Sequence, residues 1–175
     1  MTKNNAAIDQ LKKSLSEVSN EIQGTAANDS TPAGTDMEDG SVFAGVTRDG
    51  QKIFAMPMDL GFTATFNDAV KAVEKLNEKK ALGHDDWQIP DLETLKILHS
   101  NKNQGSLKDT FKTTNKWTGS VFPAWYWSSS SYDGSSHAVD YVRFWGGFEY
   151  WDYKDDFHLS CRPVRLSPVS APSLG

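Results

Sequence analysis

The stretch from Trp125 to Arg165 constrains the fold of this 175-residue chain more than any other segment. It is rich in Tyr, Trp, Ser, Gly and Asp, and it is poor in the Val, Ile and Leu that usually fill buried strands. Rigid aromatic rings beside small hydrogen-bonding residues are typical of recognition surfaces. The alternative is an aromatic-rich β domain whose rings fill its own core. Composition alone leaves both interpretations open.

Strand alternation is visible within this stretch. From residue 138 onward, a period of two predicts a strand with two distinct faces. The glycine pair at 146–147 is expected to reverse the chain into a second strand over residues 148–153. A last strand is expected to end at Arg165. The C-terminal part of the domain is therefore predicted to be a small β-sheet.

Two helices and a hairpin are predicted before this sheet. Apolar residues recur at helical spacing from Phe66 to Leu76, behind Thr65 as a candidate cap. Asp91 is expected to cap a second helix by accepting backbone N–H bonds. The sequence Arg48-Asp49-Gly50 between two apolar runs predicts a hairpin turn.

Two separated blocks of residues resemble a known family, and we call them the frame residues. The first block, GHDDWQIP at residues 83–90, precedes the second predicted helix. The second block consists of YWSSS at 126–130, Ala138, Phe144, Gly147, Lys154 and the final R-x-V-R at 162–165. Together the blocks, within about residues 40–165, resemble the C-type-lectin-fold domain shared by Lcl C-terminal-like proteins and the variable proteins of diversity-generating retroelements. This fold is related to that of the formylglycine-generating enzyme.

The resemblance implies a C-type-lectin-like α+β fold with two helices and short antiparallel strands. In retroelement variable proteins, adenine-directed mutagenesis diversifies C-terminal codons while the frame persists. The resemblance therefore implies a ligand-binding surface between the frame residues. The candidate ligand-binding residues are aromatic, acidic or small polar: Tyr132, Asp133, Ser135, His137, Asp140, Tyr141, Trp145, Tyr150, Trp151, Asp152, Tyr153 and Asp155.

Burial should separate the frame from this candidate surface. Core substitutions typically cost about 2–5 kcal/mol, whereas surface substitutions cost under about 0.5 kcal/mol. A scaffold that tolerates many sequences must therefore place its variation outside the core. We expect the candidate aromatic side chains, Tyr141 included, to cluster on one exposed face. The residues expected to be buried are Trp125, Trp127, Ala138, Phe144 and Cys161.

Four segments are expected along the chain. Residues 1–23 are predicted to form a coiled-coil oligomerisation helix, because apolar residues at 8, 11, 15, 18 and 22 follow heptad spacing. A single helix that packs on its own domain is the alternative. Residues 24–40 are polar and are expected to be a flexible linker. The C-type-lectin-like domain is assigned to 41–165, with its variable segment at 125–165, and the Pro/Ser-rich residues 166–175 to a loose tail.

Charge, cysteine content and hydropathy argue against several classes of protein. A net charge of −5 and a pI near 5.3 disfavour nucleic-acid binding, which relies on a positive surface. Cys161 is the only cysteine, so a disulfide within the chain is excluded. The first residues do not resemble a Sec signal peptide, so none is expected, and the sequence lacks an apolar run of about 18 residues. We expect synthesis in the cytoplasm, with virion incorporation or display by a non-Sec route left open.

Enzymatic activity is not predicted. The serines at 128–131 lack a G-x-S-x-G turn, and a hydrogen-bonding role is favoured for them. Cys161 lacks the paired cysteine on which the formylglycine-generating enzyme depends, and His158 is weak support for a nucleophile–base pair. The sequence triplets of calcium-dependent lectins are absent. Neither a catalytic residue nor a cofactor is therefore expected.

Metal binding is also less favoured than ordinary surface roles. The adjacent residues at 84–86 suit a turn better than a metal site. The acidic residues Asp152, Asp155 and Asp156 are expected to form a solvated or ligand-facing rim rather than a calcium site. The expected function is non-catalytic binding of a protein or other macromolecular ligand by a homo-oligomer. The alternative is a structural or assembly module of a phage virion or surface appendage.

Overall fold

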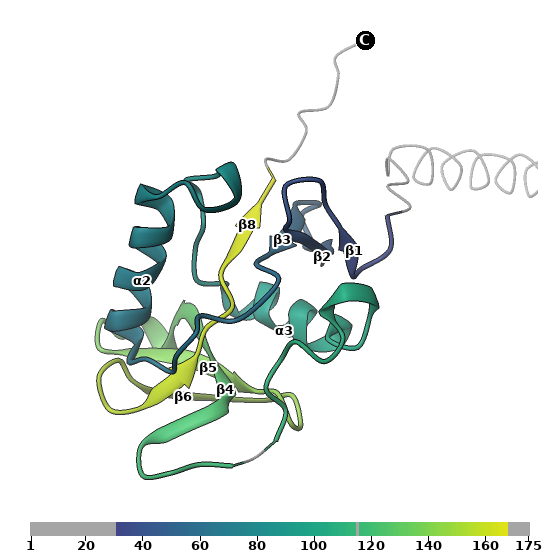
Figure 1. Cartoon of the computed structure of the whole chain (residues 1–175). Coiled ribbons are helices and arrows are strands. Elements are labelled where there is room, and N and C mark those ends of the chain that lie inside the picture. Colours follow the sequence, from purple (N-terminus) through teal and green to yellow (C-terminus); the bar gives the residue numbers. More distant parts are fainter. Residues whose placement is uncertain (1–30, 115, 168–175) are drawn as a thin grey trace, which may run out of the picture. The chain divides into compact units, whose positions relative to one another are not determined.

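The computed structural model describes residues 31–114 and 116–167, and it confirms the α+β fold class. The helix expected over residues 1–23 lies outside the described residues, as do residues 168–175 of the tail expected at 166–175. The expectation of a loose tail is wrong for Leu166, which belongs to a strand and pairs with Ile53. The elements, labelled as in Figure 1, are β1 (Thr35–Asp36), β2 (Val42–Val46), β3 (Lys52–Ala55), α2 (Phe66–Glu78), η1 (Ala81–Gly83), α3 (Leu92–Asn101), η2 (Gly105–Leu107), β4 (Val121–Ser131), η3 (Tyr132–Gly134), β5 (Ala138–Arg143), β6 (Phe148–Tyr153), β7 (His158–Ser160) and β8 (Val164–Leu166).

The strands of the described residues form two four-stranded sheets (Figure 1). One has the order β1-β2-β3-β8 and is antiparallel throughout. The other has the order β6-β5-β4-β7, in which only β7 runs parallel to its neighbour, β4. The hairpins predicted around residues 48–50 and 146–147 are both confirmed as the pairs β2–β3 and β5–β6.

The single last strand predicted to end at Arg165 is wrong. Two short strands replace it, and each belongs to a different sheet. Between them lies Pro163, which has no backbone N–H to give to a strand ladder. The side chain of Arg162 turns into the interior, where it binds Asp59 at 2.8 Å. The chain therefore leaves one sheet and joins the other at this point.

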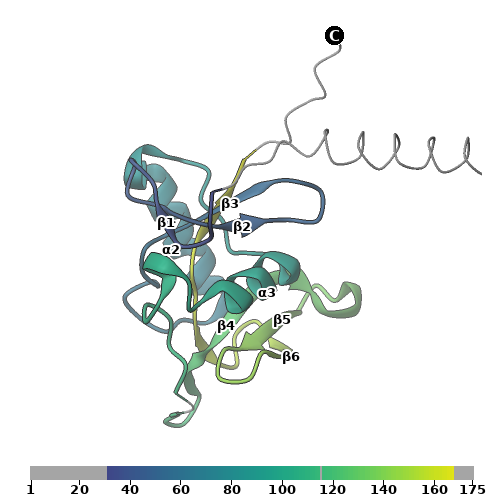
Figure 2. The ribbon, with the colours of Figure 1, turned by 90° about the vertical axis from the view of Figure 1, so that its right-hand side faces the viewer.

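Helix α3 lies between the two sheets, as Figure 2 shows. Asp91 caps it as predicted, since its carboxylate accepts a hydrogen bond from the N–H of Thr94 at 2.8 Å. Its fully buried residues Leu95 and Leu98 contribute to one of two apolar clusters. The other members of that cluster come from both sheets and from the segment after α3: Val42, Ala44, Ile53, Ala55, Leu107, Phe111, Tyr126, Val142, Phe144 and Val164.

Helix α2 covers the opposite face of the second sheet and belongs to the other apolar cluster. Thr65 caps it as predicted, with its hydroxyl accepting from the N–H of Asp68 at 3.2 Å. Phe66 meets Trp127 edge to face, with ring centroids 5.9 Å apart. The indole N–H of Trp127 donates to the carbonyl of Ala64 at 2.8 Å. The second sheet is thus buried by α3 on one face and by α2 on the other.

The ordered domain starts earlier than predicted. Residues 24–40 were expected to be a flexible linker. Strand β1, which lies within that range, instead pairs with β2. The N–H of Gly34 donates to the carbonyl of Phe43 at 2.7 Å. A Cβ atom at Gly34 would lie 2.2 Å from the carbonyl oxygen of Gln104, so only glycine fits this contact. Strand β1 has no signal in the sequence because its residues are polar and backbone hydrogen bonds to β2, rather than apolar side chains, hold it in place.

Candidate functional site

The five residues that were expected to be buried do lie in the core. Trp125, Trp127, Ala138, Phe144 and Cys161 are all buried. Burial raises the pKa of the Cys161 thiol, which keeps it protonated and disfavours a nucleophilic role. These side chains hold the fold and are not available to a ligand.

Arg162, the first residue of the R-x-V-R motif, is fully buried in a polar cage. Its guanidinium donates from Nε to the Asp59 carboxylate at 2.8 Å and from Nη2 to the carbonyl of Thr110 at 2.8 Å. It also lies 3.9 Å from the ring centroid of Phe111. The Asp59 carboxylate accepts a further hydrogen bond from the Tyr126 hydroxyl at 2.7 Å. This part of the frame therefore fastens residues that are far apart in sequence.

The serine run joins β4 to the start of α3. The Ser130 hydroxyl accepts a hydrogen bond from the N–H of Leu92 at 2.9 Å. The N–H of Ser129 donates to the carbonyl of Pro90 at 2.8 Å. Ser128 is buried, and its hydroxyl accepts from the N–H of Ser130 at 3.0 Å. The hydrogen-bonding role predicted for these serines is confirmed by these contacts.

Phe144 and Gly147 both pack against His99 at the end of α3. The rings of His99 and Phe144 meet edge to face with centroids 5.1 Å apart. Gly147 has a φ of +73°, and a Cβ atom there would lie 2.6 Å from the His99 ring. Burial and the neighbouring charge of Lys102 lower the pKa of His99. The Phe-x-x-Gly motif therefore sets the turn that leads into β6.

Most of the predicted ligand-binding residues reach the surface around β5, β6 and η3. The large aromatic side chains are between 39% and 52% exposed in Tyr132, Trp145, Tyr150, Trp151 and Tyr153. Among the polar candidates, Asp133, His137 and Asp155 are exposed, and Ser135, Asp140 and Asp152 are half-buried. Phe148, which is not among the residues predicted from sequence, is 53% exposed beside Trp145, with ring centroids 5.7 Å apart. We call these residues, without Tyr141, the β6 surface.

The prediction that Tyr141 is exposed is wrong. Tyr141 is 3% exposed and stacks on Trp125 with ring centroids 5.1 Å apart. It pairs with Trp127 of β4 across the sheet, so its side chain lies on the face covered by α2. Burial raises the pKa of its hydroxyl. Tyr141 therefore belongs to the core that supports Tyr150, whose ring stacks on it at 5.9 Å.

The expected single aromatic face is also wrong, because successive side chains of β6 point to opposite faces of the sheet. Tyr150 pairs with Tyr141 and lies on the side of α2. Its ring covers the guanidinium of Arg143 at 3.8 Å. Trp151 lies on the other side, where Tyr132 stacks on it with centroids 4.3 Å apart. The β6 surface therefore wraps around both sides of an edge strand.

Carboxylates lie close together on the β6 surface. The half-buried Asp140 has a raised pKa because of burial and the nearby charge of Glu149. Glu149 itself pairs with Lys96 of α3 at 2.6 Å. Burial and the charge of Asp156 raise the pKa of Asp152, against a hydrogen bond from the N–H of Tyr153. Crowded carboxylates of this kind favour a cationic ligand.

A hollow of about 370 Å³ brings three of the predicted residues together, namely His137, Tyr153 and Asp155. It is completed by residues that were not predicted as ligand-binding: Asn67, Ser136, Lys154 and Asp156. The amide of Asn67 donates to the Asp155 carboxylate at 2.6 Å. The Lys154 ammonium donates to the carbonyl of Ser136 at 2.8 Å. Asn67 lies on α2, and only the tertiary fold brings it to this site.

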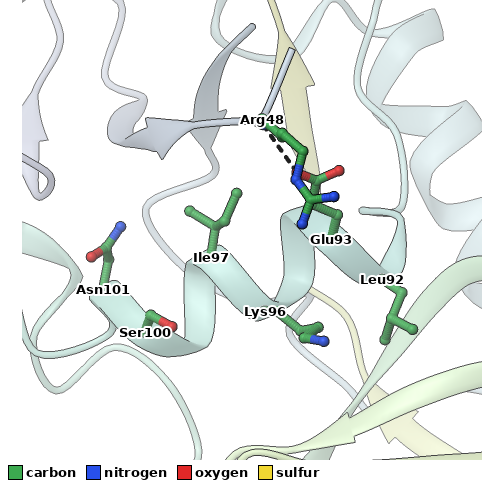
Figure 3. Close-up of a pocket in the computed structure, with 7 residues that line it drawn as sticks. All are labelled: Arg48, Leu92, Glu93, Lys96, Ile97, Ser100 and Asn101. Carbon is green, nitrogen blue, oxygen red and sulfur yellow. Dashed lines mark hydrogen bonds between the residues drawn. The ribbon is translucent and has the colours of Figure 1, made fainter. Parts of the chain in front are cut away.

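A second hollow, of about 590 Å³, lies along α3 (Figure 3). In the figure, the N–H of Arg48 from the β2–β3 turn donates to the Glu93 carboxylate at 3.0 Å. Lys96 lines the hollow and also pairs with Glu149, so the hollow adjoins strand β6. In sequence, the charges of α3 indicate only a solvated helix face, which gives no signal for this hollow. It is lined by Arg48, Leu92, Glu93, Lys96, Ile97, Ser100 and Asn101.

Metal sites and membrane spans can be assessed in the part of the chain that the structure describes. Within it, His, Cys, Asp and Glu side chains do not form a group of three or more that would suit a metal ion. Residues 84–86, the metal site considered from the sequence, instead make contacts that hold the fold together. His84 meets the Asp39 carboxylate at 2.8 Å, and Asp86 binds Arg165. Helices long and apolar enough to cross a membrane are likewise absent from residues 31–114 and 116–167.

Comparison with known protein families identifies the family of this domain. A comparison with curated proteins gives no significant match. A scan against protein families matches residues 23–165 to the Lcl C-terminal domain. The matched region contains both blocks of frame residues and the whole β6 surface. The chain therefore belongs to the Lcl C-terminal domain family, the C-type-lectin-like family that its frame residues resemble.

Proposed function

We propose that this protein recognises a macromolecular ligand, most readily a protein, through the β6 surface and without catalysis. The observation that carries the proposal is the separation of two sets of aromatic residues. The rings of Trp125 and Trp127 on β4 are buried, whereas Tyr150, Trp151 and Tyr153 on β6 of the same sheet are 41–52% exposed. A protein that needed these exposed rings only for stability would bury them, because exposed aromatic area does not contribute to the hydrophobic stabilisation of the fold.

The chemistry of the β6 surface suits binding. Tyrosine and tryptophan supply a large contact area and lose little rotamer entropy when a ligand binds. Tyr132 and Trp151 already stack on each other, which orders both rings before binding. The surrounding carboxylates select basic or hydrogen-bond-donating ligands. The self-association predicted for residues 8–22 would add avidity to a weak single site.

We further propose that the positions between the frame residues are diversified by a retroelement. The physical support is that the side chains at most of these positions lie outside the core, where substitution costs little stability. Sequencing of the flanking DNA tests this directly. A near-copy of the Trp125–Arg165 coding region that differs at adenines, beside a reverse-transcriptase gene, is expected. Its absence would refute diversification but not ligand binding.

Binding itself is tested with a displayed library of random protein fragments. Clones selected on the full-length protein should lose binding to a triple variant, Tyr150→Ser with Trp151→Ser and Tyr153→Ser. The matched control changes Phe62 and Trp117 to serine, since both rings are exposed elsewhere on the domain. The control should retain binding.

The triple variant must also remain folded for this result to count. We expect a loss of about 1–2 kcal/mol, because Tyr150 stacks on Arg143 and Trp151 stacks on Tyr132. Thermal melting measures this loss. Selected clones that bind the triple variant as well as the parent would refute the proposed function, and they would favour the structural or assembly module instead. A collapse of the melting transition would show that the rings are core.

A further inference from the structure

Strand β6 is an open edge of its sheet. It has six residues, whereas the other edge strands of the two sheets, β1, β7 and β8, have two or three. Its pairing with β5 is regular over all six residues and contains no bulge. Proline, which would block an added strand, does not occur in β6. Exposed edges of this length are unusual because they present unpaired backbone groups to other chains.

The register identifies which backbone groups of β6 are free. The N–H of Lys154 donates to the carbonyl of His137, in the same register as the β5–β6 ladder. Because hydrogen-bonded pairs alternate in an antiparallel ladder, residues 148, 150 and 152 bond to β5. The N–H and C=O groups of residues 149, 151 and 153 therefore point away from the sheet.

The protein itself uses the backbone groups at one end of this edge. The Asp152 carboxylate accepts a hydrogen bond from the N–H of Tyr153 at 2.8 Å. The carbonyl of Tyr153 accepts from the N–H of Asp156 at 3.4 Å. Among the described residues, Glu149 and Trp151 have no such partners for their outward N–H and C=O groups. These two residues offer two donors and two acceptors, spaced for one added strand.

The side chains beside this edge are acidic and aromatic. Residues 132–156 contain six carboxylates but only two basic side chains, Arg143 and Lys154. The guanidinium of Arg143 lies between the rings of Trp125 and Tyr150, at 4.2 and 3.8 Å. The Lys154 ammonium is bound to the carbonyl of Ser136. Within the described residues, neither of these two cations forms an ion pair with a carboxylate, and the six carboxylates outnumber them.

The two sides of the edge differ in chemistry. On the side of α3, Asp140 and Glu149 lie with Trp151, and only Glu149 has a basic partner among the described residues. A lysine or arginine side chain of an added strand would reach Asp140 there. On the side of α2, the exposed rings of Phe148 and Tyr150 offer apolar area. An occupant with alternating basic and apolar residues matches both sides at once.

We propose that β6 binds an extended, basic segment of a partner protein as an added β-strand. This inference rests on the proposed function and specifies how its ligand is held. Backbone hydrogen bonds to Glu149 and Trp151 fix the register of the segment. Its apolar side chains lie on the side of Tyr150, and its lysine or arginine side chains lie on the side of Asp140. Main-chain pairing tolerates changes in neighbouring side chains, so it persists while those side chains set the specificity.

Charge argues against a second copy of this chain as the occupant. Edge-to-edge pairing of two β6 strands would bring two sets of carboxylates together, and like charges across an interface cost free energy. A basic partner segment removes the same repulsion. The affinity of β6 for the basic segment should therefore fall as the salt concentration rises, because salt screens charges at an exposed edge.

The test uses a capped peptide of alternating valine and lysine, labelled for fluorescence anisotropy and long enough to span β6. One control peptide replaces lysine with glutamate, and another carries N-methyl groups along the backbone. We expect the valine–lysine peptide to bind the full-length protein at least about tenfold more tightly than either control. Hydrogen exchange measured by NMR should slow at the amides of Glu149 and Trp151.

Two variants separate the backbone from the charge. Glu149→Pro removes the outward N–H together with the carboxylate, whereas Glu149→Gln removes only the charge. Proline is tolerated where the N–H of an edge strand faces solvent. The proline variant should bind about three- to tenfold more weakly than the glutamine variant, the effect of one hydrogen bond. Asp140→Asn should weaken binding while leaving the backbone unchanged, and circular dichroism checks that each variant is folded.

The outcomes distinguish this inference from the proposed function. Equal binding of the N-methylated peptide, without protection at Glu149 and Trp151, would overturn strand addition. Failure of the valine–lysine peptide to bind would overturn it as well. Either result leaves recognition by the β6 surface to be decided by the library selection. A peptide that instead induces dimers of the protein, seen by sedimentation, would show edge pairing between copies and would also refute the inference.

Discussion

Replacement of Arg162 by methionine should destabilise the domain by about 3–5 kcal/mol, the usual cost of breaking a buried ion pair from one side. Arg162 is fully buried, and its partner Asp59 is 8% exposed at the side chain. The substitution leaves the Asp59 carboxylate and the carbonyl of Thr110 without the guanidinium that binds them. Methionine keeps the approximate length of the side chain, so lost packing contributes little.

The matched control is Arg165→Met in the same R-x-V-R motif. Arg165 pairs with Asp86, whose side chain is 52% exposed, and with Asp39 at 3.5 Å. These pairs are more accessible than Arg162–Asp59, and exposed pairs contribute only about 0–1 kcal/mol, so this variant should lose much less stability than Arg162→Met. Urea unfolding of the full chain, followed by tryptophan fluorescence, measures both losses. A loss in Arg162→Met no larger than that in Arg165→Met would refute the structural role assigned to the buried guanidinium.

A second substitution tests the cause of the loss. Asp59→Asn in the Arg162→Met background removes the uncompensated charge, and its amide oxygen still accepts from the Tyr126 hydroxyl. It should restore about 1–2 kcal/mol. Burial already raises the pKa of Asp59 against the opposing charge of Arg162, and loss of Arg162 raises that pKa further. Since the folded state then binds the proton more tightly, the loss in Arg162→Met should shrink as the pH falls from neutral towards about 5.

Three further predictions concern folding and assembly. Residues 32–167 should fold alone, because β1 to β8 contain both apolar clusters; a fragment without a cooperative melting transition would contradict this. Gly147→Ala should cost about 1–3 kcal/mol in urea unfolding, because φ is +73° and the new Cβ would meet His99 at 2.6 Å; an unchanged midpoint would show that the turn relaxes freely. Full-length protein should sediment as an oligomer, and Leu11→Asp with Leu15→Asp should give monomers by placing charges in the heptad seam; a monomeric parent would remove avidity from the proposed function.

Local patterns in the sequence were sufficient for the helices and hairpins. The caps at Thr65 and Asp91 form as predicted because capping needs only a side-chain oxygen and backbone N–H groups within three residues. The turns at 48–50 and 146–147 form where glycine allows the chain to reverse. By contrast, β1 has no apolar signal, since its partner strand and the close contact at Gly34 define it.

The candidate site was only partly predictable. The sequence separates buried from surface residues correctly for Trp127 and Phe144, which belong to the frame pattern, and for Trp125 directly before it. It fails for Tyr141, which looks like its exposed neighbours in composition but is stacked on Trp125. Asn67 of α2 and Lys96 of α3 lie beside the site. The polar residues of a helix look the same in sequence whether they face a binding site or solvent, so neither residue could be predicted.

The sequence by itself determined the alternation of β6, which puts Tyr150 and Trp151 on opposite faces of a strand. Only the tertiary structure decided that both faces are open to solvent, because β6 lies at the edge of its sheet, where the helices cover neither side chain fully. In a central strand, the same alternation would bury both rings, as it does for Tyr126 and Trp127 of β4. Alternation is a local property of the backbone, whereas exposure depends on which strands and helices pack beside it.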